Sequence, residues 1–163
     1  LDAFEQLWLI GTDINLVIVG KQGWMMDEFI NRLSQHPELN TRLFFLEAIS
    51  DEYLEKVYVA STCLLAASYG EGFGLPLIEA AQHKIPIIAR DIPVFRMMAN
   101  NYAFYFDSKE PVGLADSIQT WLHQYKKGEH PTSIDMPWLT SKESAKQLLN
   151  LIIPDDHFNN PDK

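Results

Sequence analysis

The chain has 163 residues, of which 47% are hydrophobic, and its formal net charge at pH 7 is −9. This length and composition are typical of one packed domain that buries about 70% of the surface of its extended chain, which excludes a disordered protein. The negative charge argues against nucleic acid or an anionic membrane as a partner, because both demand a positive surface.

The cysteine content and the hydropathy of the sequence indicate the cellular compartment that we expect for this protein. The single cysteine, Cys63, lies in the apolar run "CLLAA", where it is expected to be a core residue and not a nucleophile. One cysteine allows no disulfide within the chain, which favours a reducing, cytoplasmic location. We expect no membrane span, because no apolar run approaches the roughly 20 residues that a span needs.

Helical patterns are predicted from the first residue onward. Residues 1–10 carry apolar side chains at Leu1, Phe4, Leu7 and Trp8, which is the spacing of one helical face. Because the chain begins inside this pattern and without an initiator methionine, we expect an N-terminally truncated part of a longer protein. Further helices are predicted at residues 25–35, 50–61, 76–83, 93–99, 111–128 and 141–152.

Short apolar runs between these helices are predicted to be strands. Their lack of alternation is typical of parallel strands that are covered on both faces. The sequence therefore predicts an α/β fold with a doubly wound, mainly parallel sheet and right-handed crossovers, in which the strand at 63–67 is central. Ser50 is expected to cap one helix and Pro76 to begin the next. The strands are expected at residues 16–20, 42–46, 63–67, 86–90 and 103–106.

Several smaller features complete the expected domain, which spans residues 1–153 and is followed by a polar tail at 154–163. Residues 19–24 are expected to form an ordinary strand-to-helix turn, because the GK[ST] of a phosphate loop is absent. Arg90 and Asp91 are expected to form a local ion pair. In the loop at residues 129–138, Trp138 is expected to hold the last helix against the body.

The stretch "SYGEGFGLPLIEAA", residues 68–81, carries the candidate site, because Glu71 and Glu79 stand there with seven residues between them. It directly follows the strand at 63–67, and ligands of open parallel sheets bind beyond the carboxyl ends of the strands. Its three glycines permit positive φ and a close approach of the backbone to a ligand. The helix that begins at Pro76 presents a positive amino end, which favours a phosphate.

The two carboxylates suit a ligand that has hydroxyl groups at both ends and phosphate between them, as a nucleotide sugar has. Glu79 can accept hydrogen bonds from two adjacent hydroxyls of a ribose, and Glu71 from those of a second group. The spacing alone favours a plainer interpretation, in which one carboxylate is a solvated loop charge and the other a partner of the helix dipole. The glycines, the proline and the preceding strand together favour the ligand site.

The segment "EGFGLPLIEA" resembles the E-x7-E segment of the retaining glycosyltransferases of the GT-B fold, in the large group called family 4 or group 1. The resemblance extends from "LVIVG" through "FFLEAISDEYLEKVYVAS" to "IPIIARDIPVF" and the closing helices. It implies the Rossmann-like, donor-binding half of a two-domain enzyme. The implied reaction transfers a hexose from a nucleotide diphosphate sugar to a saccharide or lipid-linked acceptor, with retention, in polysaccharide biosynthesis.

The resemblance also implies roles for single residues. Glu79 would hold the nucleotide ribose, and Glu71 would be the catalytic residue that contacts the donor sugar near the reacting carbon. The base would lie against Ile49 and Ser50. The cradle for sugar and phosphate would be formed by Gly72, Phe73, Gly74 and Leu75.

No cofactor and no metal are expected, and the five histidines show no ligand spacing. The segment "IARDIPVF" is most similar to polysaccharide mannosyltransferases, which favours GDP-mannose as the donor. The full-length protein would be cytoplasmic and peripheral at the inner face of the membrane.

Two of the departures from the family pattern bear on activity; others are Glu47 and Lys84, where glycine is common, and Met97, where an acid is common. The Arg and Lys that neutralise the diphosphate in the family are absent here, and the acceptor would bind through a missing N-terminal domain. We therefore expect the isolated chain to be inactive. Two alternatives remain open: half of a nucleotide-sugar epimerase, and a non-catalytic module that binds a nucleotide sugar.

Overall fold

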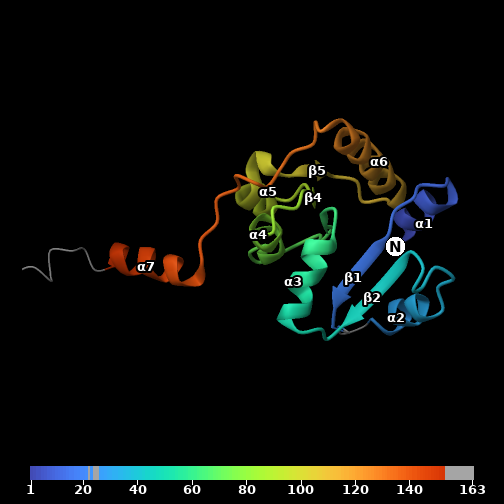
Figure 1. The fold of residues 1–163 in the computed structure, drawn as a ribbon, viewed down its shortest axis with the longest axis horizontal. Coiled ribbons are helices and arrows are strands. Elements are labelled where there is room, and N and C mark those ends of the chain that lie inside the picture. The colour runs from blue at the N-terminus through green and yellow to red at the C-terminus, as the bar shows by residue number, and fades with distance from the viewer. Residues whose placement is uncertain (22, 24–25, 153–163) are drawn as a thin grey trace, which may run out of the picture.

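The computed structural model describes residues 1–21, 23 and 26–152 (Figure 1). The expected tail at 154–163 lies outside these residues, and so does part of the expected turn at 19–24. Helices and strands alternate along the chain as the sequence predicts. Their order is α1 (Asp2–Leu9), β1 (Leu16–Gly20), α2 (Asp27–Ser34), β2 (Leu43–Glu47), α3 (Asp51–Ala60), β3 (Leu64–Ala66), α4 (Leu75–Gln82), β4 (Ile87–Arg90), α5 (Pro93–Ala99), the 3-10 helix η1 (Asn100–Tyr102), β5 (Phe104–Phe106), α6 (Pro111–Lys127) and α7 (Ser141–Ile152).

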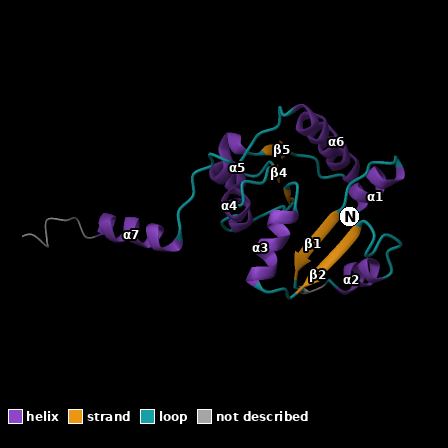
Figure 2. Ribbon diagram, in the orientation of Figure 1, coloured by secondary structure: helices purple, strands orange, loops and turns teal. Residues whose placement is uncertain are grey.

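The strands are all parallel and form two sheets (Figure 2). One sheet has the order β1-β2, and the other has the order β3-β4-β5. The expectation that the strand at 63–67 is central is wrong, because β3 lies at the end of its sheet and β4 in the middle. Burial explains the difference: β4 has a strand on either side and all four of its residues are buried, whereas Leu64 and Leu65 of β3 are only half-buried.

Helices cover both faces of the three-stranded sheet, as a doubly wound fold requires. On one face, Ile88 of β4 packs against Trp121 of α6. On the other face, Ile87 packs in one cluster with Leu77 of α4 and Phe95 of α5. The pair β1-β2 shares a second cluster with α1, α2 and α6. The α/β architecture predicted from the sequence is therefore confirmed.

The last helix, α7, extends away from the body of the molecule (Figure 1). Trp138 is exposed at 42%, so the expectation that it holds α7 against the body is wrong. The buried anchors lie earlier in the same loop, where Ser133 donates from Oγ to the carbonyl of Ile85 at 2.7 Å and Met136 joins the core. Among the described residues, no helix has the length and apolar character needed to cross a membrane.

Candidate functional site

The loop that follows β3 leads into α4 through a left-handed residue. Gly74 has φ +85° and stands at the amino end of α4, which begins at Leu75, so Pro76 takes the second helical position and not the first. A Cβ on Gly74 would lie 3.3 Å from the ring of Phe95. Positive φ and this close packing both require glycine here. The helix amino end is thus held in place by the core beneath it.

Three of the predicted cradle residues face solvent around this helix start, namely Gly72, Phe73 and Leu75, whereas Gly74 is buried. Phe73 and Leu75 are exposed at 52% and 58%. Glu71 is also exposed, and its Oε1 accepts a hydrogen bond from the backbone N–H of Gly72 at 3.0 Å. Exposed apolar side chains beside a helix amino end form a surface on which a sugar and a phosphate can lie.

Glu79 is held by a contact that the sequence did not reveal. The hydroxyl of Tyr58 in α3 donates to Oε2 of Glu79 at 2.7 Å, and the ring of His83 stacks on the ring of Tyr58 with centroids 5.2 Å apart. Burial, and then the hydrogen bond and charge of Glu79, raise the pKa of Tyr58, so its proton stays on the hydroxyl. Oε1 of Glu79 has no hydrogen-bond partner among the described residues, so it is available to a ligand.

Arg90 ties the carboxyl ends of three strands together. Its side chain is only 7% exposed and donates from Nε to the carbonyl of Ala67 after β3, at 3.1 Å. Nη1 donates to the carbonyl of Ser108 after β5, at 2.7 Å. The guanidinium also lies 4.0 Å from the ring centre of Tyr69. This cluster fixes the edge of the sheet from which the candidate loop departs.

The predicted ion pair between Arg90 and Asp91 is wrong. Asp91 pairs instead with Arg96 of α5, with Nη2 and Oδ2 2.6 Å apart. Successive side chains of a strand point to opposite sides, so Arg90 turns into the sheet edge while Asp91 faces the following helix.

A cavity of about 120 Å³ lies at this same edge of the sheet. It is lined by Tyr69, Arg90 and Ser108, which mark the ends of β3, β4 and β5, and by Leu1 and Asp2 at the start of α1. The amino end of the described chain therefore lies at the carboxyl ends of these strands.

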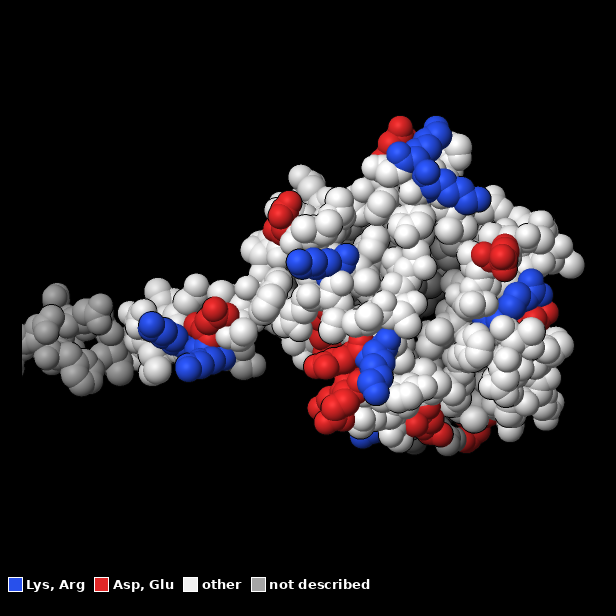
Figure 3. Space-filling view, viewed as in Figure 1, with Lys and Arg blue, Asp and Glu red and all other residues white. Residues whose placement is uncertain are grey.

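The residues predicted to contact the base lie after β2. Ser50 caps α3, as predicted, by accepting at Oγ from the N–H of Tyr53 at 3.3 Å, and Ile49 is half-buried beside it. Acidic side chains gather over the first turn of α3, where Asp51 and Glu52 lie (Figure 3). The structure thus places the predicted base contacts at the end of the β1-β2 sheet and the two glutamates next to the other sheet.

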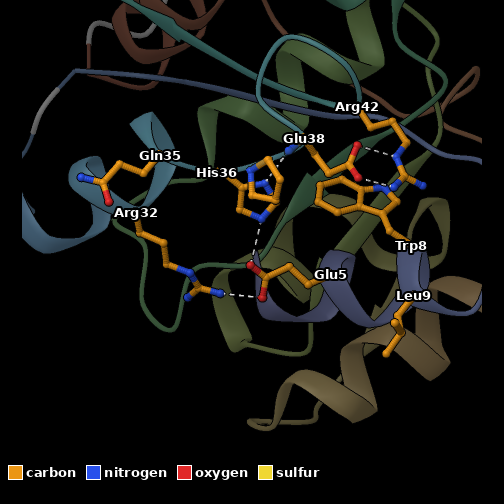
Figure 4. Close-up of a pocket in the computed structure, with 9 residues that line it drawn as sticks. Glu5, Trp8, Leu9, Arg32, Gln35, His36, Glu38 and Arg42 are labelled. Atoms are coloured by element: carbon orange, nitrogen blue, oxygen red, sulfur yellow. Dashed lines mark hydrogen bonds and ion pairs between the residues drawn. The ribbon is translucent and has the colours of Figure 1, made fainter.

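A larger cavity, of about 650 Å³, lies between α1, α2 and the segment that follows α2 (Figure 4). Glu5 accepts there from Arg32 at 2.6 Å and contacts His36 at 2.9 Å, while Arg42 donates from Nε to Glu38 at 2.9 Å. These charged groups neutralise one another. This cavity could not be predicted from the sequence, because its residues come from separate segments without a shared motif.

Two further expectations concern metal ligands and the thiol. Within the described part of the chain, no three or more His, Cys, Asp or Glu side chains gather as a metal site would require. Burial raises the pKa of the Cys63 thiol to about 12, so the thiol stays protonated at neutral pH, and Cys63 packs against the cluster of Ile88 and Trp121, as expected of a core residue.

The chain matches the family described as "Glycosyl transferases group 1" over residues 1–134, and it belongs to this family. It is 52% identical over 149 residues to the serotype-specific mannosyltransferase WbdA of Escherichia coli, covering 91% of this chain and 18% of WbdA. It is 36% identical over 106 residues to the O-antigen chain mannosyltransferase RfbU of Salmonella typhimurium, covering 64% of this chain and 30% of RfbU. The chain thus spans about a fifth of the length of WbdA.

Solved structures agree on the fold. Anabaena Alr3699/HepE in complex with UDP and glucose matches with a TM-score of 0.71 at 17% identity, over 93% of this chain and 43% of that one. The C-terminal domain of the group 1 family protein LpcC from Francisella tularensis matches with a TM-score of 0.65 at 21% identity, over 79% of this chain and 69% of that one. The fold is the Rossmann-like half of a GT-B glycosyltransferase.

Proposed function

We propose that this chain is the donor-binding domain of a retaining mannosyltransferase, and that residues 1–153 bind GDP-mannose at the carboxyl edge of β3. The observation that carries the proposal is the carboxylate of Glu79 beside the amino end of α4, which Tyr58 fixes at one oxygen and whose other oxygen is bound by none of the described residues. The choice of mannose is supported by two relatives, WbdA and RfbU, which are both named mannosyltransferases.

Each predicted residue has a proposed task that its geometry permits. Oε1 of Glu79 accepts from the two ribose hydroxyls, and the amino end of α4 attracts the diphosphate. Glu71, the proposed catalytic residue, contacts the donor sugar near the reacting carbon with the oxygen that Gly72 does not occupy. The exposed turn at residues 72–75 supports sugar and phosphate, and Ile49 and Ser50 face the base.

Catalysis in this proposal rests on positioning and on stabilising the departing diphosphate. The positive end of α4 supplies that stabilisation, and the proposal includes no metal or other cofactor. If the transfer needs a metal, treatment of the full-length protein with a chelator will abolish it, which would overturn this part.

The acceptor is proposed to be a saccharide or lipid-linked saccharide that another domain of the longer protein presents, in the synthesis of a polysaccharide. We infer a cytoplasmic location, peripheral at the inner face of the membrane, and a polar tail at 154–163.

Membership of the glycosyltransferase family disfavours the epimerase alternative. A non-catalytic binding module differs from an enzyme in one measurable way, because the full-length protein would then bind GDP-mannose without transferring the sugar.

Calorimetric titration with GDP, UDP and GDP-mannose tests the donor site. We expect a Kd of about 1 mM or lower for the guanine ligands. Glu79→Ala should weaken the affinity by at least about tenfold, because it removes the oxygen that accepts from the two ribose hydroxyls. The matched control is Glu129→Ala, since Glu129 is exposed beyond the far end of α6.

Three outcomes decide the proposal. If UDP binds more tightly than GDP, the donor carries uracil and not guanine. Equal binding by the wild type and Glu79→Ala would overturn the role of Glu79. No binding of any of the three ligands to the full-length protein would overturn the donor site itself.

A further inference from the structure

The two residues predicted to face the base, Ile49 and Ser50, are poorly suited to tell one base from another. The side chain of Ile49 is apolar, and the Ser50 hydroxyl is engaged at the start of α3. Its Oγ accepts from the N–H of Tyr53 at 3.3 Å, and a hydrogen bond from Ser50 lowers the pKa of the Glu52 carboxyl. Selection between bases by a side chain therefore requires another group at this end of the β1-β2 sheet.

Glu47 stands at the same end of the sheet, as the last residue of β2, and its carboxylate is exposed. The parallel register pairs it with Gly20, the last residue of β1. Register partners in neighbouring parallel strands point their side chains to the same face of the sheet, so the missing side chain of Gly20 leaves room beside Glu47. Within the described part of the chain, a Cβ on Gly20 would meet no atom within 4 Å. A planar base can lie in this space.

The turn that follows Glu47 holds a strained residue. Ala48 has φ +50°, in the left-handed region that residues with a Cβ rarely adopt, and it lacks the polar side chain that eases this conformation in Asn or Asp. Residues 48–50 are the whole connection between β2 and α3, so the turn leads directly into the cap at Ser50. Strained residues gather at ligand sites, where the surrounding structure holds the backbone in one arrangement. The backbone of Glu47 is thus fixed by the ladder before it and by this turn after it.

Helix α3 connects this end of the sheet to the proposed ribose contact. It begins directly after Ser50, and Tyr58 in its last turns donates to Oε2 of Glu79 at 2.7 Å. From Ser50 to Tyr58 the helix rises about 12 Å. Helical side chains lean back toward the amino end, so the Tyr58 hydroxyl lies closer to Ser50 than this length. A nucleoside can span such a separation, with its ribose at Glu79 and its base at the end of β2.

We propose that Glu47 reads the base of the donor by accepting two hydrogen bonds, from the N1–H and the 2-amino group of guanine. Guanine alone among the common bases presents two neighbouring N–H donors on one edge, and the two oxygens of a carboxylate accept from such a pair. Uracil presents a single N–H between two carbonyl oxygens, so a carboxylate that faces it meets an oxygen and is repelled. This inference rests on the proposed function, because it assigns the base selectivity of the same donor site.

Glu47 differs in one respect from the two acids that follow it. Asp51 and Glu52 lie in the first turn of α3, where their charges stabilise the positive end of the helix. Glu47 belongs to the strand and precedes the cap, so the helix dipole does not account for a carboxylate at this position. Asp51 is therefore the matched control, as a neighbouring exposed carboxylate with a structural task.

Titration of the full-length protein with GDP and with inosine diphosphate (IDP) tests this role. IDP is GDP without the 2-amino group, and the two ligands carry the same charge. The ratio of their Kd values therefore isolates one hydrogen bond from any change in fold or in net charge. The wild type should bind GDP about tenfold or more tightly than IDP. Glu47→Ala should reduce this ratio to about twofold or less, and Asp51→Ala should leave it unchanged.

Transfer from GDP-mannose gives a second readout. The base contact is the same before and during the reaction, so Glu47→Ala should raise KM much more than it lowers kcat. An effect on kcat alone would contradict a role in reading the base and overturn the inference.

The outcomes separate this inference from the proposed function. An unchanged ratio in Glu47→Ala, with GDP binding still weakened in Glu79→Ala, would overturn the role of Glu47 and leave the donor site in place. The role of Glu47 would also be overturned if the wild type binds GDP and IDP equally, or if UDP binds more tightly than GDP. If none of these nucleotides binds, the donor site is overturned, and the role of Glu47 with it.

Discussion

Two regions of the molecule hold clustered carboxylates, and they differ in how those carboxylates are used. In the large cavity of Figure 4, Glu5 is shared by Arg32 and His36, and Glu38 is bound by Arg42 through both oxygens. Around the start of α4, neither Glu71 nor Glu79 forms an ion pair with any of the described residues. Each of these two accepts at one oxygen, Glu71 from a backbone N–H and Glu79 from a tyrosine hydroxyl.

If the donor binds as we propose, cavity size does not locate the donor site of this protein. An ionised carboxylate can accept about four hydrogen bonds, and those of the large cavity already bind charged donors. Glu71 and Glu79 keep most of their capacity, and they flank a helix amino end that favours an anion. We therefore interpret the large cavity as a structural junction between α1 and α2, and the open surface at α4 stays the candidate donor site.

The largest expected effect is that of Glu71→Gln on transfer by the full-length protein. The amide has the shape of the carboxylate without its charge, so it should lower kcat by about 100-fold or more. The Kd of GDP should stay within about threefold of the wild type, because the proposed role of Glu71 is at the sugar and not at the nucleotide. Steady-state kinetics and titration with GDP check both parts. If Glu71→Gln does not change kcat, Glu71 is a solvated loop charge and not a catalytic residue.

A smaller effect is expected from Gly74→Ala, which adds a methyl group at the start of α4. Positive φ strains any residue with a Cβ, and the new atom would press on the ring of Phe95 at 3.3 Å. We expect a loss of about 1–3 kcal/mol in the free energy of unfolding, together with weaker nucleotide binding. Urea denaturation measures the first. Gly70→Ala is the control, because a Cβ there meets open space at ordinary φ, and equal losses in the two variants would contradict the argument.

Tyr58→Phe tests the contact that fixes Glu79. Removing the hydroxyl should cost about 1–2 kcal/mol of unfolding free energy, because a half-buried carboxylate loses its donor. Tyr53→Phe, at an exposed position of the same helix, should cost little. Denaturation at neutral pH compares the two variants, and equal costs would show that the contact with Glu79 contributes nothing to stability.

The same contact predicts a pH dependence with a definite sign. Burial and Glu79 raise the pKa of Tyr58 in the folded state, so the stabilisation is complete below the unfolded-state pKa of about 10 and declines as the pH rises above it. Above that pH, the wild type should lose stability more steeply than Tyr58→Phe. Parallel slopes for the two proteins would show that Tyr58 does not titrate differently in the folded state.

The sequence predicted the strands to within about one residue and the start of α3, because these depend on local signals such as apolar runs and the cap at Ser50. It also located the two glutamates at one strand end. It did not predict the partner of Glu79, since Tyr58 lies 21 positions earlier and only the packing of α3 on α4 brings them together. The pairing of Asp91 with Arg96 was missed for the related reason that side-chain direction depends on where a strand ends.

The position of β3 in its sheet shows a different limit of prediction from the sequence. Its apolar run correctly predicted a strand, but a central place requires neighbours on both edges, and the neighbours of a strand are set by segments far away in the chain. In the structure β4 has two such neighbours and β3 has one.

The smallest expected effect is that of Arg32→Ala, which tests the ion pairs of the large cavity. Arg32 is bound to Glu5 and Asp2, but its side chain is 43% exposed, so the ion pairs are screened by solvent. The loss in unfolding free energy should stay below about 1 kcal/mol and shrink further in about 1 M salt, where charges are screened over a few ångströms. The Kd of GDP should not change, since the proposed site lies elsewhere. If Arg32→Ala abolishes nucleotide binding while Glu79→Ala does not, the large cavity is the binding site, and its paired charges must open to admit the ligand.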